Sequence, residues 1–208
     1  MCNSYRITPK QGAVKGVRGK VAVAAGKLAS SLLRKSDPGI VVLADERVAV
    51  MRWGFHRNFN SSINNARSDK LAGGMWAEAF GSRRCVIPAS AFYEWGPPAV
   101  GGAKQAHEFR DPEDDYLWLA GLWEDGPDEF GPCYSMVTTA AGPAMANIHQ
   151  RMPAVLRPDE VRGFLIDGDR WDFQPFTGSL VVTPCESPLK RQSPPQQDPQ
   201  AELWDWKR

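Results

Sequence analysis

The sequence predicts an α+β fold with a mostly antiparallel, barrel-like β-sheet and a few peripheral helices. From residue 40 onward, short runs rich in Val, Ile, Thr and aromatic residues recur, separated by clusters of Gly, Pro or Asp. Only a few stretches have a helical period, and the sequence holds no internal repeat. Many short strands with few interspersed helices are typical of this class.

The first elements are expected to be a helix and a hairpin. Residues 10–35 are mostly Gly, Ala, Val and Lys, and only LASSLLRK at 28–35 has a helical period, so we expect a loop followed by a short helix. IVVL at 40–43 and RVAVMRWGF at 47–55 predict a hairpin that follows the turn signal Asp37-Pro38-Gly39. The polar residues 56–68 are expected to form a loop, with Ser68 capping a helix through 75–80.

The later elements are expected to be mainly strands. The expected strands are residues 83–88, 91–95, 116–124, 133–139 and 179–184. Between them we expect a flexible hairpin loop, an acidic loop, a helical turn, an extended segment and a helix, at residues 96–104, 125–131, 143–148, 151–156 and 158–165. We expect one domain over residues 1–186 and a C-terminal tail of linker composition over 187–208.

Composition predicts a soluble cytoplasmic protein. Hydrophobic residues make up 42% and charged residues 24% of the chain, which is close to the average for globular proteins. The N-terminus lacks a secretory apolar run, and no apolar stretch approaches the length of a membrane span. The four cysteines are far apart, so neither a disulfide framework nor a metal site is expected, and Cys85, Cys133 and Cys185 are expected to be small buried residues. We expect no cofactor and a monomer.

Charge is distributed unevenly along the chain. Residues 1–90 hold 15 basic and 5 acidic residues, whereas the remainder holds 10 basic and 19 acidic residues, although the net charge is only +1. This asymmetry indicates either an N-terminal half that faces a polyanion or a mixed surface whose charges cancel after folding. Charge alone does not separate these interpretations.

Cys2 is the residue with the most distinctive chemistry. A small second residue favours removal of Met1, which would leave an N-terminal cysteine with an α-amine of pKa about 7.7–8.0 beside a thiol of pKa about 8.5. Such an aminothiol can condense with an aldehyde to an imine, which the thiol then closes to a five-membered thiazolidine. The alternatives are a nucleophile that attacks an amide or ester, and a cysteine that is buried by chance.

Three other residue types could support chemistry at Cys2. Asn65, in the run Asn64-Asn65-Ala66-Arg67, can orient an amine or thiol. Glu94, in the run AFYEWG, can transfer protons near neutral pH if the aromatic residues beside it desolvate it. His149 titrates in the working range. For each residue, an ordinary structural role is the alternative.

A possible nucleic-acid surface lies near Arg52. Trp53, Phe55, Phe59 and Trp76 are close in sequence to Arg52, Arg57 and Arg67. Aromatic residues that alternate with arginines suit unpaired bases, although core packing is the alternative for the aromatic residues.

Seven motifs in order give the chain a resemblance to a known family. They are MC at the N-terminus, RWGF, NAR, RRCVIPASAFYEW, LAGLWE, VTT and IHQRMP, spread over residues 1–186. This set resembles the SRAP family, the SOS response-associated peptidases or abasic-site processing proteins, and it implies the SRAP fold. The resemblance further implies an enzyme of DNA damage and repair that acts on single-stranded DNA containing abasic sites.

The resemblance also implies residue roles. Cys2 would form a covalent thiazolidine with the ring-opened aldehyde, Asn65 would orient Cys2, Glu94 would transfer protons, and His149 would assist ring opening, strand cleavage or reversal. The positions implied to contact DNA are Arg67, Trp53, Thr138 and Pro38.

The N-terminus departs from the pattern of the family. Its members commonly begin MCGR, whereas this chain has Asn3 and Ser4 in place of Gly and Arg. Arg6 is on the same strand face as Ser4 and is expected to replace the phosphate contact. Three functions remain: covalent capture of abasic sites with side activity as a lyase, a thiol (auto)peptidase that uses Cys2, Glu94 and His149, and a non-covalent single-stranded DNA-binding protein.

Overall fold

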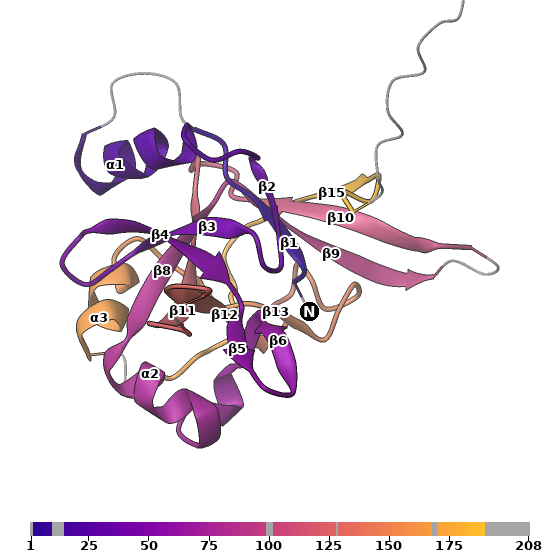
Figure 1. Ribbon diagram of the computed structural model, residues 1–208. Coiled ribbons are helices and arrows are strands. Elements are labelled where there is room, and N and C mark those ends of the chain that lie inside the picture. The colour runs from indigo at the N-terminus through magenta and orange to yellow at the C-terminus, as the bar shows by residue number, and fades with distance from the viewer. Residues whose placement is uncertain (1, 10–14, 99–101, 128, 168–169, 190–208) are drawn as a thin grey trace, which may run out of the picture.

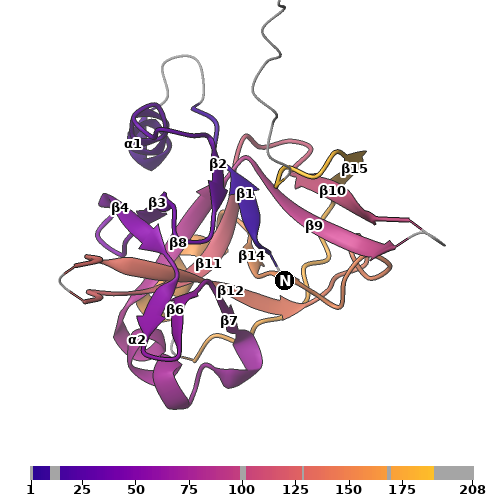
Figure 2. The ribbon, with the colours of Figure 1, turned by 45° about the vertical axis from the view of Figure 1, so that its right-hand side comes forward.

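The computed structural model describes residues 2–9, 15–98, 102–127, 129–167 and 170–189, and all statements below concern these residues. Two β-sheets share one core, and short helices lie at the periphery (Figures 1 and 2). The predicted class, α+β with a mostly antiparallel, barrel-like sheet, is confirmed.

The larger sheet closes into a barrel of five strands. The barrel strands are β3 (Pro38–Val42), β4 (Val48–Trp53), β8 (Arg84–Ala89), β11 (Leu117–Glu124) and β12 (Cys133–Ala140). They pair in the order β12-β4-β3-β8-β11, and β11 pairs back with β12. Three short strands extend this sheet, namely β7 (Asn65–Arg67), β13 (Arg151–Pro153) and β14 (Val155–Leu156). All pairings are antiparallel except those of β12 with β4 and β7.

The second sheet holds the N-terminus. Its strands are β1 (Ser4–Arg6), β2 (Leu32–Arg34), β9 (Ala91–Pro98), β10 (Lys104–Arg110) and β15 (Val181–Cys185), in the order β15-β10-β9-β1-β2. The hairpin of β9 and β10 projects from the body of the molecule (Figure 1). A separate two-stranded sheet consists of β5 (Phe55–Arg57) and β6 (Asn60–Ile63).

The helices lie outside the barrel. They are α1 (Gly16–Ala25), α2 (Ala77–Ser82) and α3 (Glu160–Asp167), with two 3-10 turns, Ser68–Lys70 and Gly74–Trp76. Helix α1 packs against β3 and β4, and α3 packs against β8. Among the described helices, none has the length and apolar character that a membrane crossing requires.

Three aromatic residues join the two sheets in the core. Tyr5 from β1, Trp53 from β4 and Tyr134 from β12 are fully buried. The rings of Tyr5 and Trp53 meet edge to face, Trp53 stacks on Tyr134, and the two tyrosine hydroxyls hydrogen-bond at 2.5 Å. Gly39 lies under these hydroxyls, where a Cβ atom would come within 2.0 Å of the Tyr134 oxygen. This contact explains the glycine within β3.

Most expected strands are present, but the predictions for residues 28–35 and 56–68 are wrong. The hairpin predicted at 40–55 is formed by β3 and β4. The helix expected at 28–35 is absent, because these residues form a turn and β2, which pairs with β1, while the helix lies earlier as α1. The polar residues 56–68 contain β5, β6 and β7 rather than a loop, because β7 finds its partner in the distant β12.

Smaller differences concern Ser68, the cysteines and the tail. Ser68 lies inside a 3-10 turn that has no side-chain cap. Cys85 and Cys133 are buried as expected, whereas Cys185 is only partly buried. Residues 99–101 of the expected hairpin loop, and residues 190–208 of the expected tail, lie outside the described residues, so the boundary at residue 186 stays a prediction.

Arg84 joins two helices to the barrel. Its guanidinium is buried and donates hydrogen bonds to the carbonyls of Phe80 and Gly81 in α2 and of Phe164, Leu165 and Ile166 in α3. These carbonyls lie near helix C-termini, where a cation is favourable.

Arg84→Met should therefore destabilise the protein by about 3 kcal/mol or more, since hydrogen bonds to charged groups contribute about 1.5–3 kcal/mol each and the carbonyls would stay buried. Arg83→Met is the matched control. Arg83 makes ion pairs with the exposed carboxylates of Glu78 and Asp125 and lies over the Trp123 ring at 5.9 Å, so its loss should cost about 1 kcal/mol, less than the loss of Arg84. Denaturant unfolding of both variants measures the difference, and equal losses would contradict this role of Arg84.

Candidate active site around Cys2

Cys2 lies at the end of the second sheet where β1 begins, two residues before the first residue of that strand. Strand β1 is paired on both sides, with Ser4 opposite Arg34 of β2 and opposite Tyr93 of β9. Cys2 itself is 1% exposed, and its thiol donates a hydrogen bond to the Ser4 carbonyl at 3.3 Å. The double pairing fixes the position of the residue that the sequence singles out.

Two asparagine amides hold the backbone of Cys2. Nδ2 of Asn65 donates to the Cys2 carbonyl at 2.8 Å, and Nδ2 of Asn64 donates to the same oxygen at 3.1 Å. Asn65 begins β7, which is held in place by its parallel pairing with β12. Asn65 was expected from the sequence as the orienting residue, whereas Asn64 was not assigned a role, although the doubled asparagine was a signal for it.

Glu94 and His149 form a pair next to Cys2. Oε1 of Glu94, on β9, lies 3.5 Å from Nε2 of His149, and the glutamate side chain is only 3% exposed. Burial raises the pKa of Glu94, while His149 opposes this rise. Nδ1 of His149 lies 2.9 Å from the Arg151 carbonyl and 3.0 Å from the Arg151 amide, so the backbone of β13 orients the ring.

Burial and the Glu94 carboxylate both affect the pKa of the Cys2 thiol. Burial raises the pKa of Cys2 well above its ordinary value, and the carboxylate of Glu94 raises it further. Cys2 precedes β1, Glu94 lies in β9 and His149 precedes β13, and the fold brings these distant segments together. The site therefore combines a protonated thiol, a buried carboxyl group with a raised pKa and an imidazole.

Two buried polar atoms near Cys2 have no hydrogen-bond partner among the described residues. They are Oγ of Ser4, which is fully buried, and Oδ1 of Asn65. Buried polar atoms in native proteins are generally satisfied, so such atoms in a site are available to a ligand or to ordered water.

Arg67 and Arg151 lie beside the site and share an acidic partner. Arg67 makes a two-pronged ion pair with Asp69, with 3.0 and 2.7 Å between their nitrogen and oxygen atoms. Nη1 of Arg151 lies 3.6 Å from the same carboxylate, and the Arg151 guanidinium also donates to the Thr138 carbonyl and hydroxyl. The Arg67 ion pair lowers the pKa of Asp69 to about 2. Arg151, within the IHQRMP motif, is a further basic residue that the sequence did not single out.

The other residues expected at DNA occupy different environments. Trp53 and Thr138 are fully buried, with the indole nitrogen bonded to the Asn64 carbonyl and the threonine hydroxyl 3.4 Å from the Ala66 carbonyl. Both support the backbone of residues 64–66, and contact with DNA would require this packing to open. Pro38 is exposed at the start of β3.

Two further arginines are held by neighbouring groups. Nε of Arg6 donates to the Tyr93 hydroxyl at 2.9 Å, which places this guanidinium on the β9 side of β1. Arg52 donates to the carbonyls of Gly54 and Ser61 and to the Ser36 hydroxyl, so it braces the start of the β5–β6 hairpin. Their roles at DNA stay predictions.

The described residues hold no cluster of three or more His, Cys, Asp or Glu side chains arranged for a metal ion.

Comparison with known proteins adds the context of a family. A family model described as SOS response associated peptidase (SRAP) matches residues 1–190. Abasic site processing protein HMCES of Xenopus tropicalis is 34% identical over 161 residues, which cover 61% of this chain and 47% of that protein. Abasic site processing protein YoqW of Bacillus subtilis is 27% identical over 132 residues, or 59% of this chain and 58% of YoqW. The chain thus spans about half the length of these curated relatives.

Solved structures show the same fold. A crystal structure of a Bordetella bronchiseptica protein superposes with a TM-score of 0.69 at 22% identity, covering 89% of this chain and all of that chain. A Bacteroides thetaiotaomicron protein gives a TM-score of 0.69 at 17% identity, over 88% of this chain and 91% of that chain.

The burial of Cys2 predicts slow alkylation with an unusual pH dependence. In protein that retains Met1, modification of Cys2 by iodoacetamide should be slow at pH 7 and should rise about tenfold per pH unit through pH 9 without a plateau, because the thiolate is the reactive form and the pKa of Cys2 is raised. Mass spectrometry of the peptide that carries Cys2 measures the rate. The partly buried Cys185 should react faster in the same sample, and fast modification of Cys2 with a plateau near pH 8.5 would contradict the burial.

Proposed function

Because the chain belongs to the SOS response-associated peptidase (SRAP) family, we propose that it captures abasic sites in single-stranded DNA through a covalent bond to Cys2. The relatives named above are abasic site processing proteins, which supports a role on damaged DNA. We further propose that the protein acts as a monomer in the cytoplasm on chromosomal DNA.

One arrangement carries the proposal. The carbonyl of Cys2 is held by Asn64 and Asn65, while its thiol lies within electrostatic reach of the Glu94 carboxylate, which faces His149. Holding the backbone of Cys2 fixes both its α-amine and its thiol relative to one proton-transferring pair. Such positioning contributes more to rate than any single contact, because the reacting groups need no further ordering.

The proposed reaction has two bond-forming steps and releases one water. After Met1 is removed, the α-amine of Cys2 attacks the aldehyde carbon of the ring-opened abasic sugar, and the carbinolamine loses water to give an imine. The thiol then adds to the imine carbon. A C–S bond forms, the thiol proton ends on the nitrogen, and a five-membered thiazolidine links protein and DNA. Ring closure is intramolecular, which favours the adduct over free imine.

Glu94 and His149 supply the proton transfers. Burial raises the pKa of Glu94, so this carboxyl group holds its proton at a higher pH than an exposed glutamate does, and we assign it the donation of a proton to the departing water and the acceptance of one from the thiol. His149, which is partly exposed and lies 3.5 Å from Glu94, can assist opening of the sugar ring. Where the thiol does not close the ring, the imine permits β-elimination, which accounts for lyase side activity.

Two alternative functions make different demands on the same residues. A thiol peptidase needs a thiolate with a base in contact, whereas here the thiol donates to the Ser4 carbonyl, its pKa is raised, and Nε2 of His149 faces Glu94. A non-covalent DNA-binding protein needs no aminothiol at all. The adduct experiment below separates all three.

Cys2 substitutions test the covalent step. Protein with Met1 removed, confirmed by intact mass, should form an adduct with single-stranded abasic DNA without borohydride, at a mass equal to the sum of both less one water. Cys2→Ser should lose at least nine tenths of the stable adduct but still be trapped by borohydride, because its amine remains.

The control is Cys185→Ser, which removes a partly buried thiol on β15 and should react like the wild type. If Cys2→Ala gives a stable adduct as readily as the wild type, the proposed thiazolidine linkage is wrong. Release of peptide from a test substrate without any DNA adduct would favour the peptidase.

Asp69 should weaken the binding of DNA. Because its carboxylate occupies Arg67 and lies near Arg151, a DNA phosphate must displace it or share both arginines with it. Asp69→Asn should tighten binding to single-stranded DNA at least threefold near 50 mM salt, and the gain should shrink as salt rises. Fluorescence anisotropy measures the affinity.

The matched control for this prediction is Asp45→Asn. Asp45 also pairs with an arginine, Arg47 at 3.4 Å, and its loss changes the net charge equally, but it lies in the turn between β3 and β4. An equal gain in both variants would show a general charge effect and would remove Asp69 from the DNA surface.

A further inference from the structure

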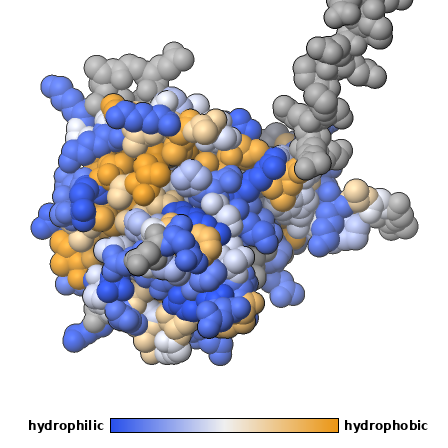
Figure 3. All heavy atoms as spheres, viewed as in Figure 1, coloured by the Kyte–Doolittle hydropathy of each residue, from blue (hydrophilic) through white to orange (hydrophobic). Residues whose placement is uncertain are grey.

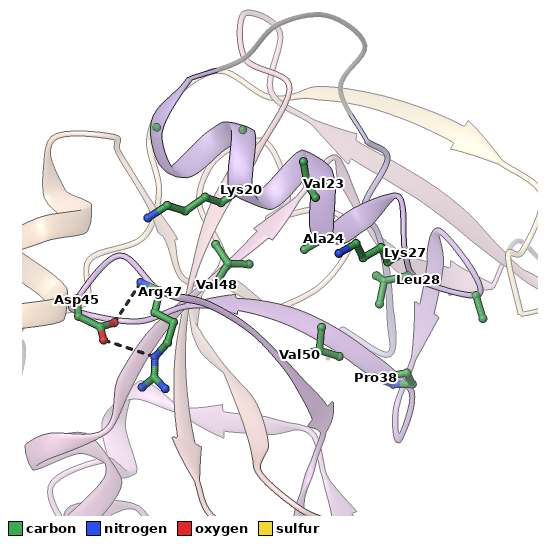
Figure 4. Close-up of a pocket in the computed structure, with 13 residues that line it drawn as sticks. Lys20, Val23, Ala24, Lys27, Leu28, Pro38, Asp45, Arg47, Val48 and Val50 are labelled. Atoms are coloured by element: carbon green, nitrogen blue, oxygen red, sulfur yellow. Dashed lines mark hydrogen bonds and ion pairs between the residues drawn. The ribbon is translucent and has the colours of Figure 1, made fainter.

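A groove of about 1090 Å³ lies between α1 and the hairpin of β3 and β4 (Figure 4). Val23, Ala24 and Leu28 line it from the side of α1, and Val48 and Val50 of β4 line the opposite wall. The space-filling view shows an apolar patch over this part of the molecule (Figure 3). Cys2, Asn64, Asn65, Glu94 and His149 do not line this groove, whereas Pro38, which was expected at DNA, lies at its edge.

The walls of the groove expose large apolar side chains. Val23 is 63% exposed and Val50 is 52% exposed, and both lie in this single groove. Single exposed valines are ordinary, but two that face one groove form a surface that loses water favourably when it is covered. An occupant should therefore be apolar in part.

The charges at the groove indicate that the occupant should also be acidic. Three of its lining residues are basic, namely Lys20, Lys27 and Arg47, and only Asp45 is acidic. Asp45 is paired with Arg47, and the Lys20 ammonium donates to the Glu46 carbonyl, whereas the side-chain ammonium of Lys27 makes no hydrogen bond or ion pair within the described part of the chain. An apolar segment with carboxylates would match both features.

The described chain ends close to one end of this groove. Nη2 of Arg34 donates to the Pro188 carbonyl at 3.1 Å, and the backbone amide of Arg34 donates to Asp37 at 2.8 Å. The next residue after Asp37 is Pro38, which lines the groove. Residues 190–208 therefore continue from a point anchored to the segment that leads into the groove wall.

These residues contain a segment of the required chemistry. Residues 202–206 read ELWDW, with two carboxylates and three large apolar side chains. The twelve residues 190–201 before it include three prolines and can extend over about 40 Å. A tethered segment binds at a high effective concentration, so modest intrinsic affinity suffices.

We propose that the groove is the docking site for the chain's own segment 202–206. Trp204 and Trp206 cover Val23 and Val50, and Glu202 and Asp205 face Lys20 and Lys27. The proposal does not depend on the function of Cys2, and it assigns a binding partner to a surface that the catalytic chemistry leaves unused.

A labelled peptide, QAELWDWKR (residues 200–208), tests the docking on full-length protein. A tail variant that carries Leu203→Ser, Trp204→Ser and Trp206→Ser should bind the peptide, because its groove is empty. Wild-type protein should bind at least tenfold more weakly, because its own tail competes. Fluorescence anisotropy gives both affinities.

Groove variants, made in the tail variant, show where the peptide binds. Val23→Glu should weaken binding at least tenfold, and Lys27→Glu should weaken it and reduce its salt dependence, because Lys20 remains in the groove. Ile166→Glu changes an apolar residue of α3 with similar exposure, 48%, outside the groove, and should bind normally. Circular dichroism checks that each variant is folded, as expected for exposed positions.

Three results would overturn the proposal. The peptide could fail to bind the tail variant, bind wild type and tail variant equally, or bind regardless of Val23→Glu. A fourth result would change the proposed occupant of the groove. If competition in the wild type disappears on dilution, the tail of a second copy fills the groove rather than the chain's own.

Discussion

The pairing of β1 on both of its edges is the constraint on which the site depends. N-terminal residues generally fray, yet here β2 and β9 hold Ser4–Arg6 in the middle of a sheet. Tyr5 adds an anchor in the core through Trp53 and Tyr134. With the strand fixed, the backbone of Cys2 can be held by side chains from a third strand, β7. A flexible terminus could not keep Cys2 beside Glu94.

The site around Cys2 contains buried polar groups that lower the stability of the folded protein. Glu94 has a raised pKa in the folded chain, so the folded state binds its proton more tightly than the unfolded state does. Its contribution therefore lowers stability as the pH rises from the unfolded pKa to the folded one. The unsatisfied Ser4 hydroxyl adds to this cost. By contrast, the buried guanidinium of Arg84 makes five hydrogen bonds to helix carbonyls.

The sequence predicted elements whose partners are close in the chain. The hairpin of β3 and β4 follows from two apolar runs and a turn, and Cys2, Asn65, Glu94 and His149 were found by their chemistry and by the motifs around them. The short strands β2 and β7 were not predicted, because three polar or mixed residues become a strand only when a distant strand pairs with them. The resemblance implied that Trp53 and Thr138 contact DNA, whereas both are fully buried and hydrogen-bonded to the backbone of residues 64–66. Helix α1 was missed since its Gly-rich, weakly amphipathic sequence has little periodic signal.

The position of β9 in the chain also has a consequence for the timing of N-terminal processing. Ser4 cannot pair with Tyr93 until the ribosome has synthesised β9, and synthesis proceeds at about 5–20 residues per second. For several seconds the N-terminus of the nascent chain is free of its sheet, and a processing enzyme can reach it. Once β1 is inserted, Cys2 is almost completely enclosed. If Cys2 acts through its α-amine as proposed, removal of Met1 and folding of the protein are in kinetic competition, and slower folding of β9 would favour a larger fraction of molecules with a free Cys2 amine.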